Sequence, residues 1–185
     1  MIRTATETDL PFITEIYRDA VLYGTATYEL EPPSLVEMTD RFAQLQAQGY
    51  PFLVATDSDE AVLGYAYAGP FRARPAYRFI VEDSIYLAPQ AKGHGLGTAL
   101  LKALIDEVQK LGFRQVIAVI GDGTPDSASV RLHEKLGFHH TGNLKGSGYK
   151  HGRWLDTSFM QLEMNGGTNE PPDPGSWPEI ALKDG

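Results

Sequence analysis

The sequence contains no cysteine among its 185 residues. This absence excludes a disulfide framework, a thiolate metal site and a thiol nucleophile. An acyl group transferred by this chain would therefore pass directly from donor to acceptor. Four of the five histidines also show no ligand spacing supported by carboxylates, so we predict that the protein binds no metal.

Long apolar runs are missing as well. No run approaches the roughly 20 residues that a membrane-spanning helix needs, and no basic segment followed by an apolar one opens the chain. The net charge of -8 argues against nonspecific binding to nucleic acid or anionic membranes, which requires a basic face. We therefore expect a soluble, cytoplasmic protein with neither nucleic-acid nor membrane partners.

Basic residues nonetheless gather in two short segments. They are Arg72, Arg74 and Arg78 in the first segment and Lys145, Lys150 and Arg153 in the second. An anionic small molecule can therefore be bound locally by a protein that is acidic overall.

The chain is long enough for one well-packed domain and too short for two of ordinary size. Hydrophobic periodicity predicts the order strand, two helices, three strands, helix, strand, helix and two strands. The predicted elements lie at about 1–5, 12–20, 34–49, 52–56, 61–68, 79–87, 100–111, 116–120, 130–136, 138–144 and 155–164. After Asn165 the composition shifts to glycine and proline, so we predict a domain at 1–164 and a mobile tail at 165–185.

The segment 90–98, with the sequence Gln-Ala-Lys-Gly-His-Gly-Leu-Gly-Thr, separates a predicted strand from a long amphipathic helix. Its three glycines allow backbone N–H groups to turn toward a ligand, and the helix dipole adds positive charge at the same place. The segment therefore predicts a phosphate site. A Walker loop is excluded because no lysine precedes Thr98, and the dinucleotide fingerprint lacks its third glycine.

The order of the elements and the Gln-x-x-Gly-x-Gly loop resemble the GNAT superfamily of N-acetyltransferases over residues 1–164. Five further blocks resemble the phosphinothricin and methionine sulfoximine acetyltransferases within it, at 67–70, 73–77, 81–82, 129–138 and 149–156. The resemblance implies an α/β (α+β) GNAT acyl-CoA N-acyltransferase fold. In this fold a central mixed, mostly antiparallel sheet is flanked by helices.

The resemblance implies acetyl-CoA as the co-substrate. The strand residues Ile85, Tyr86 and Leu87 would pair with the pantetheine arm, whose amides can extend a sheet. The pyrophosphate would bind the loop residues Gly93, His94, Gly95, Leu96, Gly97 and Thr98. Asp126 stands where the family usually has an asparagine that donates to the cofactor arm, and an ionised carboxylate cannot donate. Ser127 or Ser129 is an alternative donor, and Asp126 is alternatively a helix N-cap.

The substrate amine arrives protonated and needs a base before it attacks a thioester. We expect Glu82 to be this base, because partial burial in an apolar strand raises the pKa of a carboxylate. The alternative is a carboxylate paired with Arg74 or Arg78. His133 corresponds to a histidine or tyrosine near the leaving sulfur in related enzymes, as an acid or an orienting group, and its alternative is a structural role.

The resemblance further implies that the loop after the third strand reads the acceptor. The predicted acceptor-binding residues are Tyr67, Arg72, Arg74, Tyr77, Glu82, Asp83 and Ser84. The predicted function is acetylation of the α-amino group of methionine sulfoximine, methionine sulfone or phosphinothricin, a detoxification reaction, by a homodimer. The alternatives are acetylation of another amine, such as a peptide N-terminus or a polyamine, and a non-catalytic regulator that binds acyl-CoA.

Overall fold

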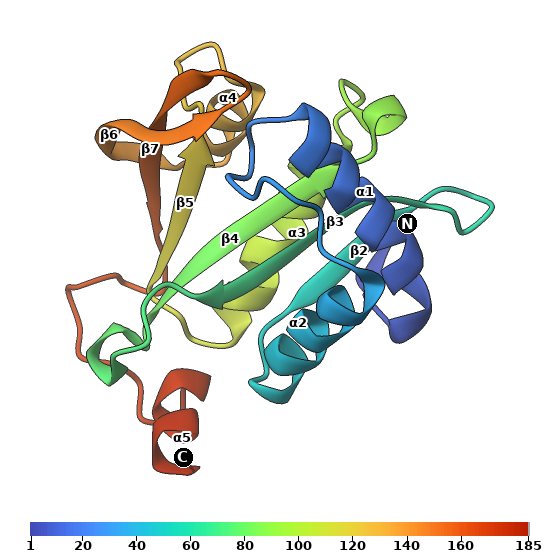
Figure 1. Cartoon of the computed structure of the whole chain (residues 1–185). Helices are drawn as coiled ribbons and strands as arrows, with labels where there is room; N and C mark the ends of the chain where they lie inside the picture. Colours follow the sequence, from blue (N-terminus) through green and yellow to red (C-terminus); the bar gives the residue numbers. More distant parts are fainter. Residues whose placement is uncertain (185) are drawn as a thin grey trace.

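A computed structural model describes residues 1–184, which form one seven-stranded sheet with helices on both faces (Figure 1). The strand order is β1-β2-β3-β4-β5-β7-β6. The strands are β1 (Ile2–Thr4), β2 (Phe52–Thr56), β3 (Val62–Pro70), β4 (Ile80–Leu87), β5 (Gln115–Gly121), β6 (His139–Lys150) and β7 (Arg153–Glu163). Only the β4–β5 pair is parallel, and the other neighbours are antiparallel. This arrangement confirms the predicted mixed, mostly antiparallel sheet.

The parallel pair β4–β5 is short. Its register runs from Ile80 opposite Gln115 to Asp83 opposite Ala118 and ends there. Beyond this point the two strands diverge, as Figure 1 shows for the ribbons of β4 and β5. The second half of β4 therefore presents its backbone groups to the opening between the strands rather than to β5.

The helices bury two separate cores on the two faces of the sheet. On one face lie α1 (Leu10–Tyr23) and α2 (Leu35–Ala47), packed over Phe52, Val54 and Tyr65. On the other face lie α3 (Leu96–Lys110) and α4 (Ala128–Lys135), packed over Leu53, Ala66 and Ala68. Because adjacent strand residues point to opposite faces, neighbouring residues of β2 and β3 enter different cores.

Local signals in the sequence set the ends of several helices. The hydroxyl of Ser34 accepts a hydrogen bond from the Glu37 N–H at 3.2 Å, and the Glu37 carboxylate accepts one from the Ser34 N–H at 2.6 Å. This is a capping box at the start of α2. Gly112 and Gly137 have φ of +88° and +91° just after α3 and α4, a conformation that favours glycine at helix C-termini.

The β6–β7 hairpin is longer than the sequence predicts, because β6 continues through Gly146 and Gly148. The register shifts between Leu144 and Gly148, so the glycines occupy a bulge instead of a loop. The N–H of Gly146 donates to the Asp156 carboxylate at 2.8 Å, which fixes the bulge against β7.

The C-terminal segment, residues 165–184, contains a helix that the sequence did not predict. It folds back onto the domain and ends in α5 (Trp177–Asp184), which lies below the sheet in Figure 1. The Trp177 ring packs against Tyr50 and Phe113, with centroid distances of 5.3 and 5.6 Å. The sequence did not predict this helix or the packing of this large aromatic side chain at the edge of the core. Among residues 1–184, no helix is both long and apolar enough to cross a membrane.

Candidate active site

Glu82 lies in β4 directly opposite Gly69 of β3, within the last part of the β4–β5 pairing. Strand alternation points Glu82, Ser84 and Tyr86 to the face that carries α1 and α2. Tyr67 pairs with Ser84 and shares that face, because directly paired residues point the same way. Gly69 has no side chain, and a Cβ there would lie 3.4 Å from Leu45 Cδ2.

The electrostatic surroundings of Glu82 suit a base. Burial raises the pKa of the Glu82 carboxyl above its usual range, the nearby Asp83 charge adds to this, and Arg72 partly offsets it. Within residues 1–184 Glu82 forms no ion pair, and Arg78 instead pairs with Glu179 at 2.6 Å. The structure therefore does not show the alternative in which Glu82 is neutralised by Arg74 or Arg78.

The acceptor loop, residues 71–79, connects β3 to β4 and contains a short 3-10 helix at Pro75–Tyr77. Arg72 and Arg74 are exposed, and in the part of the chain that the structure describes neither forms an ion pair. The Arg72 guanidinium lies over the Phe71 ring, 4.7 Å from its centroid, and Tyr77 packs edge-on against the same ring at 6.1 Å. The two arginines are thus available to an anionic ligand.

Asp83 faces the opposite side of the sheet from Glu82, toward α3 and α4. It is buried, and its Oδ2 lies 3.0 Å from Nε2 of His133 on α4. The structure therefore separates Asp83 from the other predicted acceptor-binding residues. Its Oδ1 is buried and has no hydrogen-bond partner among residues 1–184.

Both ring nitrogens of His133 are engaged. Nδ1 lies 2.7 Å from the Ser129 carbonyl, which can only accept, so Nδ1 carries a proton. The contact between Nε2 and Asp83 then requires a second proton, held by one of the two groups. Burial alone would lower the pKa of His133, but the hydrogen bond and charge of Asp83 and the Ser129 carbonyl outweigh it and raise the pKa. With both nitrogens occupied, this geometry fits an orienting group better than an acid.

The glycine loop has the backbone geometry of an anion site. Gly93 and Gly95 have φ of +84° and +80°, and a Cβ at either position would meet nothing within 4 Å. These glycines are therefore required by conformation rather than by space. The first helical bond runs from the Ala99 N–H to the Gly95 carbonyl, so the N–H groups of the first helical turn precede the hydrogen-bond ladder.

A shallow groove of about 600 Å³ runs beside this loop. It is lined by Leu63, Gln90, Ala91, His94, Gly95, Leu96 and Ala99. Gly97 has another role, because a Cβ there would lie 3.3 Å from Leu87 Cδ1, so the glycine brings α3 close to β4. Together, the free N–H groups and the groove fit a pyrophosphate. The edge of β4 that β5 leaves free at Ile85, Tyr86 and Leu87 fits an amide-bearing arm.

Asp126 lies just before α4 and is exposed. The N-cap position of α4 is Ser127, and the Asp126 carbonyl accepts a hydrogen bond from Arg131 at 2.6 Å. Asp126 is therefore not the N-cap. Ser129 faces inward on the first turn, and its hydroxyl lies 3.4 Å from Nδ1 of His133.

The linker between α1 and α2 covers the open end of the sheet, which the sequence did not reveal. The Tyr17 hydroxyl lies 2.9 Å from Thr27 and donates to Glu29 at 3.0 Å. Burial raises the pKa of Tyr17 to about 12, so the hydroxyl keeps its proton. The ammonium of Lys150 donates to the Thr27 carbonyl at 2.8 Å, and burial lowers the pKa of this lysine. In the sequence, only Tyr17 on the apolar face of the first predicted helix pointed to a buried polar contact with this linker.

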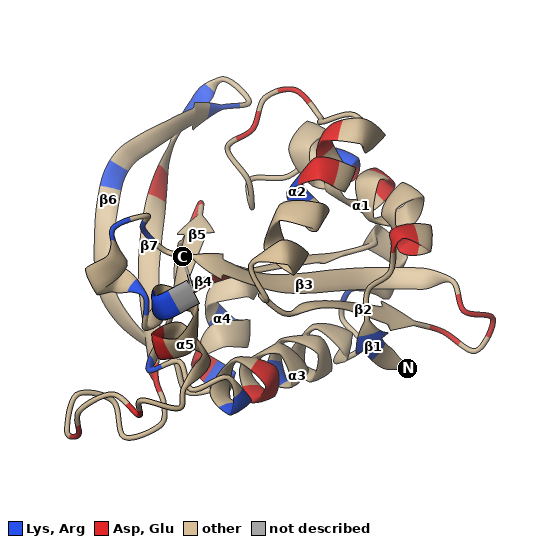
Figure 2. Cartoon of the chain, turned by 90° about the horizontal axis from the view of Figure 1, so that it is seen from below, with Lys and Arg blue, Asp and Glu red and all other residues tan. Residues whose placement is uncertain are grey.

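The charged residues are unevenly distributed over the molecule. Figure 2 shows acidic residues on α1, α2 and the β2–β3 turn, and basic residues along β6 and at the tip of its hairpin. Arg153 at that tip pairs with Asp122 at 2.6 Å. Of the two basic segments in the sequence, the acceptor loop therefore offers the arginines without ion-pair partners. Among residues 1–184, no three His, Asp or Glu side chains form a metal-binding group.

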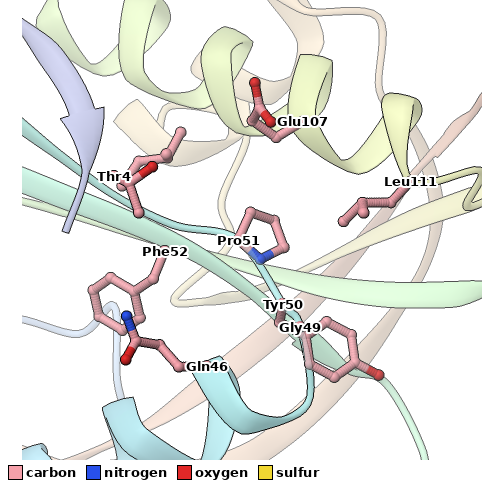
Figure 3. A pocket seen from close by; sticks show the side chains of 9 residues that line it. Thr4, Gln46, Gly49, Tyr50, Pro51, Phe52, Glu107 and Leu111 are labelled. Carbon is pink, nitrogen blue, oxygen red and sulfur yellow. The ribbon is translucent and has the colours of Figure 1, made fainter. Parts of the chain in front are cut away.

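A second groove, of about 510 Å³, lies between the α2–β2 turn and α3 (Figure 3). It is lined by Thr4, Gln46, Gly49, Tyr50, Pro51, Phe52, Leu53, Glu107 and Leu111. None of the predicted site residues lines this groove, so it is separate from the site described above.

The chain is similar to known proteins over most of its length. A family model described as an acetyltransferase (GNAT) domain matches residues 2–159, so the C-terminal segment lies beyond it. Over 172 residues the chain is 45% identical to a phosphinothricin N-acetyltransferase of Alcaligenes faecalis, covering 93% of this chain and 86% of that relative. Over 164 residues it is 42% identical to an L-methionine sulfoximine/L-methionine sulfone acetyltransferase of Pseudomonas aeruginosa, covering 89% and 94%.

A solved structure is also similar over nearly the whole chain. It is a phosphinothricin acetyltransferase of Sinorhizobium meliloti in complex with AcCoA, which is 54% identical and superposes with a TM-score of 0.94. The match covers 97% of this chain and 96% of that one. These similarities confirm the resemblance and the fold predicted from the sequence blocks.

Proposed function

The chain belongs to the acetyltransferase (GNAT) family, and on this basis we propose that it acetylates the α-amino group of a small anionic amino acid analogue. Methionine sulfoximine, methionine sulfone and phosphinothricin are the proposed acceptors, because relatives at 42–45% identity carry these names. The reaction would be a detoxification in the cytoplasm. The observation that supports the proposal is the half-buried Glu82 with Arg72 near it, in a loop whose exposed Arg72 and Arg74 have no ion-pair partner among residues 1–184.

Acetyl-CoA, when bound, supplies the thioester whose carbonyl carbon the acceptor amine attacks. Glu82 removes a proton from the ammonium of the acceptor, directly or through water, and burial favours this role by raising the pKa of its carboxyl. The nitrogen would then form the amide bond as the carbon–sulfur bond breaks, and the CoA thiolate would leave with the second proton that the nitrogen loses. Backbone N–H groups of β4 stabilise the charge on the carbonyl oxygen.

We assign the pyrophosphate to the loop Gly93–Thr98 and the pantetheine arm to the free edge of β4 at Ile85–Leu87. The anionic groups of the acceptor are assigned to Arg72 and Arg74, with Tyr67, Tyr77 and Ser84 beside them. His133 is assigned an orienting role at the sulfur end, since both of its nitrogens are engaged. Ser129 is the preferred substitute for the donor that Asp126 cannot supply.

The test is a thiol-release assay with acetyl-CoA and a panel of amino acid analogues, peptides and polyamines. We expect release with the anionic analogues, and near loss of the rate in Glu82→Gln. Glu15→Gln is the matched control, because Glu15 is an exposed carboxylate on α1, outside the site. Full activity in Glu82→Gln would remove Glu82 from the mechanism.

The second proposed acceptor class is a cationic amine, such as a polyamine or a peptide N-terminus. The observation that favours it is the net charge of -8, which steers cations toward the protein. Arg72→Ala distinguishes the two classes, with Arg18→Ala on the outer face of α1 as its control. The anionic class requires KM for the acceptor to rise in Arg72→Ala, and an unchanged KM favours the cationic class. Absence of release with every acceptor favours a non-catalytic regulator.

The protein is proposed to be a homodimer. Tyr149 and Trp154 of the β6–β7 hairpin are 58% and 69% exposed and pack against each other at 5.1 Å. They lie on the last strand pair of the sheet, where both aromatic side chains face solvent in the single chain. Sedimentation velocity is expected to give a dimer that dissociates in Tyr149→Ser/Trp154→Ser. A monomeric wild-type protein at micromolar concentration would contradict this.

A further inference from the structure

The C-terminal segment packs against the domain at Gly49, Leu111 and Gly112. Gly49 and Gly112 have positive φ, and a Cβ on them would lie 2.7 Å from Trp177 Nε1 and 2.6 Å from Ser176 Cβ. The backbone N–H of Trp177 also donates to the Leu111 carbonyl at 2.9 Å. The two glycines therefore leave space for the segment where any other residue would displace it.

The path of the segment from β7 to α5 is held by one arginine. The Arg114 guanidinium donates to the carbonyl groups of Asn165, Gly167 and Pro171, the last at 2.9 Å. The Asn165 amide in turn donates to the Gln109 carbonyl at 2.8 Å. These contacts fix the path of residues 165–171, although this stretch is rich in glycine and proline.

From this position α5 reaches the acceptor loop. Glu179 accepts hydrogen bonds from Nη2 and Nε of Arg78 at 2.6 and 3.2 Å. The same guanidinium donates to the Pro75 carbonyl at 3.2 Å and lies over the Phe79 ring at 4.4 Å. Arg78 therefore joins α5 to the turn that carries Arg74 and Tyr77. Figure 1 shows that turn beside α5, at the lower edge of the sheet.

We propose that the C-terminal segment positions the acceptor loop, and that Glu179 is a positioning residue for acceptor binding through its ion pair with Arg78. The inference rests on the proposed function, in which the loop reads the acceptor. Glu179 pairs with Arg78. Among residues 1–184 neither Arg72 nor Arg74 has a carboxylate partner, so both stay available to the acceptor. The segment lies beyond residues 2–159, the part of the chain that the family model matches.

The test compares Glu179→Gln with the control Glu170→Gln, an exposed carboxylate of the same segment outside any ion pair among residues 1–184. We expect KM for the acceptor to rise about two- to fivefold in Glu179→Gln, as loss of a partly exposed ion pair allows. KM for acetyl-CoA and kcat are expected to stay unchanged. Glu170→Gln is expected to match the wild type in all three constants.

The second readout is independent of activity. Trypsin cleaves after exposed arginines that do not precede proline, so Arg72 and Arg78 report on loop opening, whereas Arg74 precedes Pro75. Mass spectrometry is expected to show about two- to fivefold faster cleavage at these two sites in Glu179→Gln. Unchanged cleavage in that variant would overturn the proposal.

The two proposals fail separately. Faster cleavage together with an unchanged KM for the acceptor shows that the loop is held but does not position the acceptor, which overturns the role of Glu179. Faster cleavage in a protein that acetylates none of the analogues supports the structural link and overturns the proposed function instead.

Discussion

Asp83 and His133 share a proton in a site that is closed to solvent. Their side chains are each 2% exposed, and Nε2 of His133 lies 3.0 Å from Oδ2 of Asp83. Nδ1 of His133 carries a proton and donates it in a hydrogen bond to the Ser129 carbonyl. The pair is therefore either an imidazolium beside a carboxylate or a neutral imidazole beside a neutral acid. The pKa of His133 and the stability of the fold are therefore linked.

Removing the Asp83 charge is expected to lower the pKa of His133. In Asp83→Asn the burial that opposes the charged imidazolium would act without its main counterweight, so the pKa falls relative to the wild type. The measurement is an NMR titration of the His133 Cε1–H resonance. The resonances of the exposed His139 and His140 serve as internal controls in the same spectra. An unchanged His133 titration would show that Asp83 does not hold the proton.

The same pair predicts a pH dependence of stability. Because the folded pKa of His133 is raised above 6.5, the pair stabilises the fold fully below that pH. This stabilisation is lost as pH rises through the raised folded value. Replacing His133 with Gln is therefore expected to cost more free energy of unfolding at pH 6 than at pH 9. Urea denaturation at both pH values measures this, and an equal cost would contradict it.

Activity is expected to rise with pH through the raised pKa of Glu82. Burial is the main cause of this shift, and the Arg72 charge partly offsets it. The acid limb of kcat/KM should therefore move to higher pH in Arg72→Ala, and it should be absent in Glu82→Gln. Glu82→Gln is also expected to lower the rate by about 10²–10⁴-fold, a typical contribution of general base catalysis. An unmoved limb in Arg72→Ala would place the arginine too far away to act on Glu82.

Glycine substitutions separate conformation from space in the cofactor loop. Gly95→Ala imposes a left-handed conformation on alanine, which costs roughly 1–2 kcal/mol, although no atom lies within 4 Å of the new Cβ. We expect KM for acetyl-CoA to rise while KM for the acceptor stays unchanged. Gly142→Ala is the control, because its Cβ is also unopposed and its φ is ordinary. Equal effects of the two substitutions on acetyl-CoA would contradict the assignment.

The two tryptophans are expected to respond differently to truncation. Trp177→Ala should destabilise the fold by about 2–3 kcal/mol, because the ring packs against Tyr50 and Phe113 at the core edge. Trp154 is 69% exposed in the single chain, so Trp154→Ala should change the stability of the dissociated monomer by no more than about 0.5 kcal/mol. Urea denaturation of both variants tests this. A neutral Trp177→Ala would mean that the C-terminal segment is not anchored by this ring.

Much of the fold could be predicted because its signals are local. The capping box of Ser34 and Glu37, the glycines that end α3 and α4, and the loop before α3 all act within a few residues. The sequence places Glu82 and Asp83 together, however, whereas strand alternation sends them to opposite faces. This separation follows from the period of a strand and was available from the sequence once β4 had been predicted.

Long-range contacts could not be predicted in the same way. The Tyr28 hydroxyl lies 2.9 Å from Thr157, 129 residues away in the chain, and this brings the α1–α2 linker over the open end of the sheet. Nothing local in the linker indicates this partner. The helix and packing of the C-terminal segment could not be predicted for a related reason. Its composition favours disorder, whereas the Trp177 ring and the Arg114 guanidinium make contacts with residues far away in the chain.

The end of the β4–β5 pairing at Asp83 has a consequence for how this enzyme can diversify. In the proposed function the acceptor lies on the Glu82 face of β4, and the donor lies along the edge of β4 that β5 leaves free beyond Asp83. Substitutions in the acceptor loop can accordingly alter which amine is accepted without disturbing the groups that hold the thioester. A single strand thereby allows selection to act on the two substrates independently.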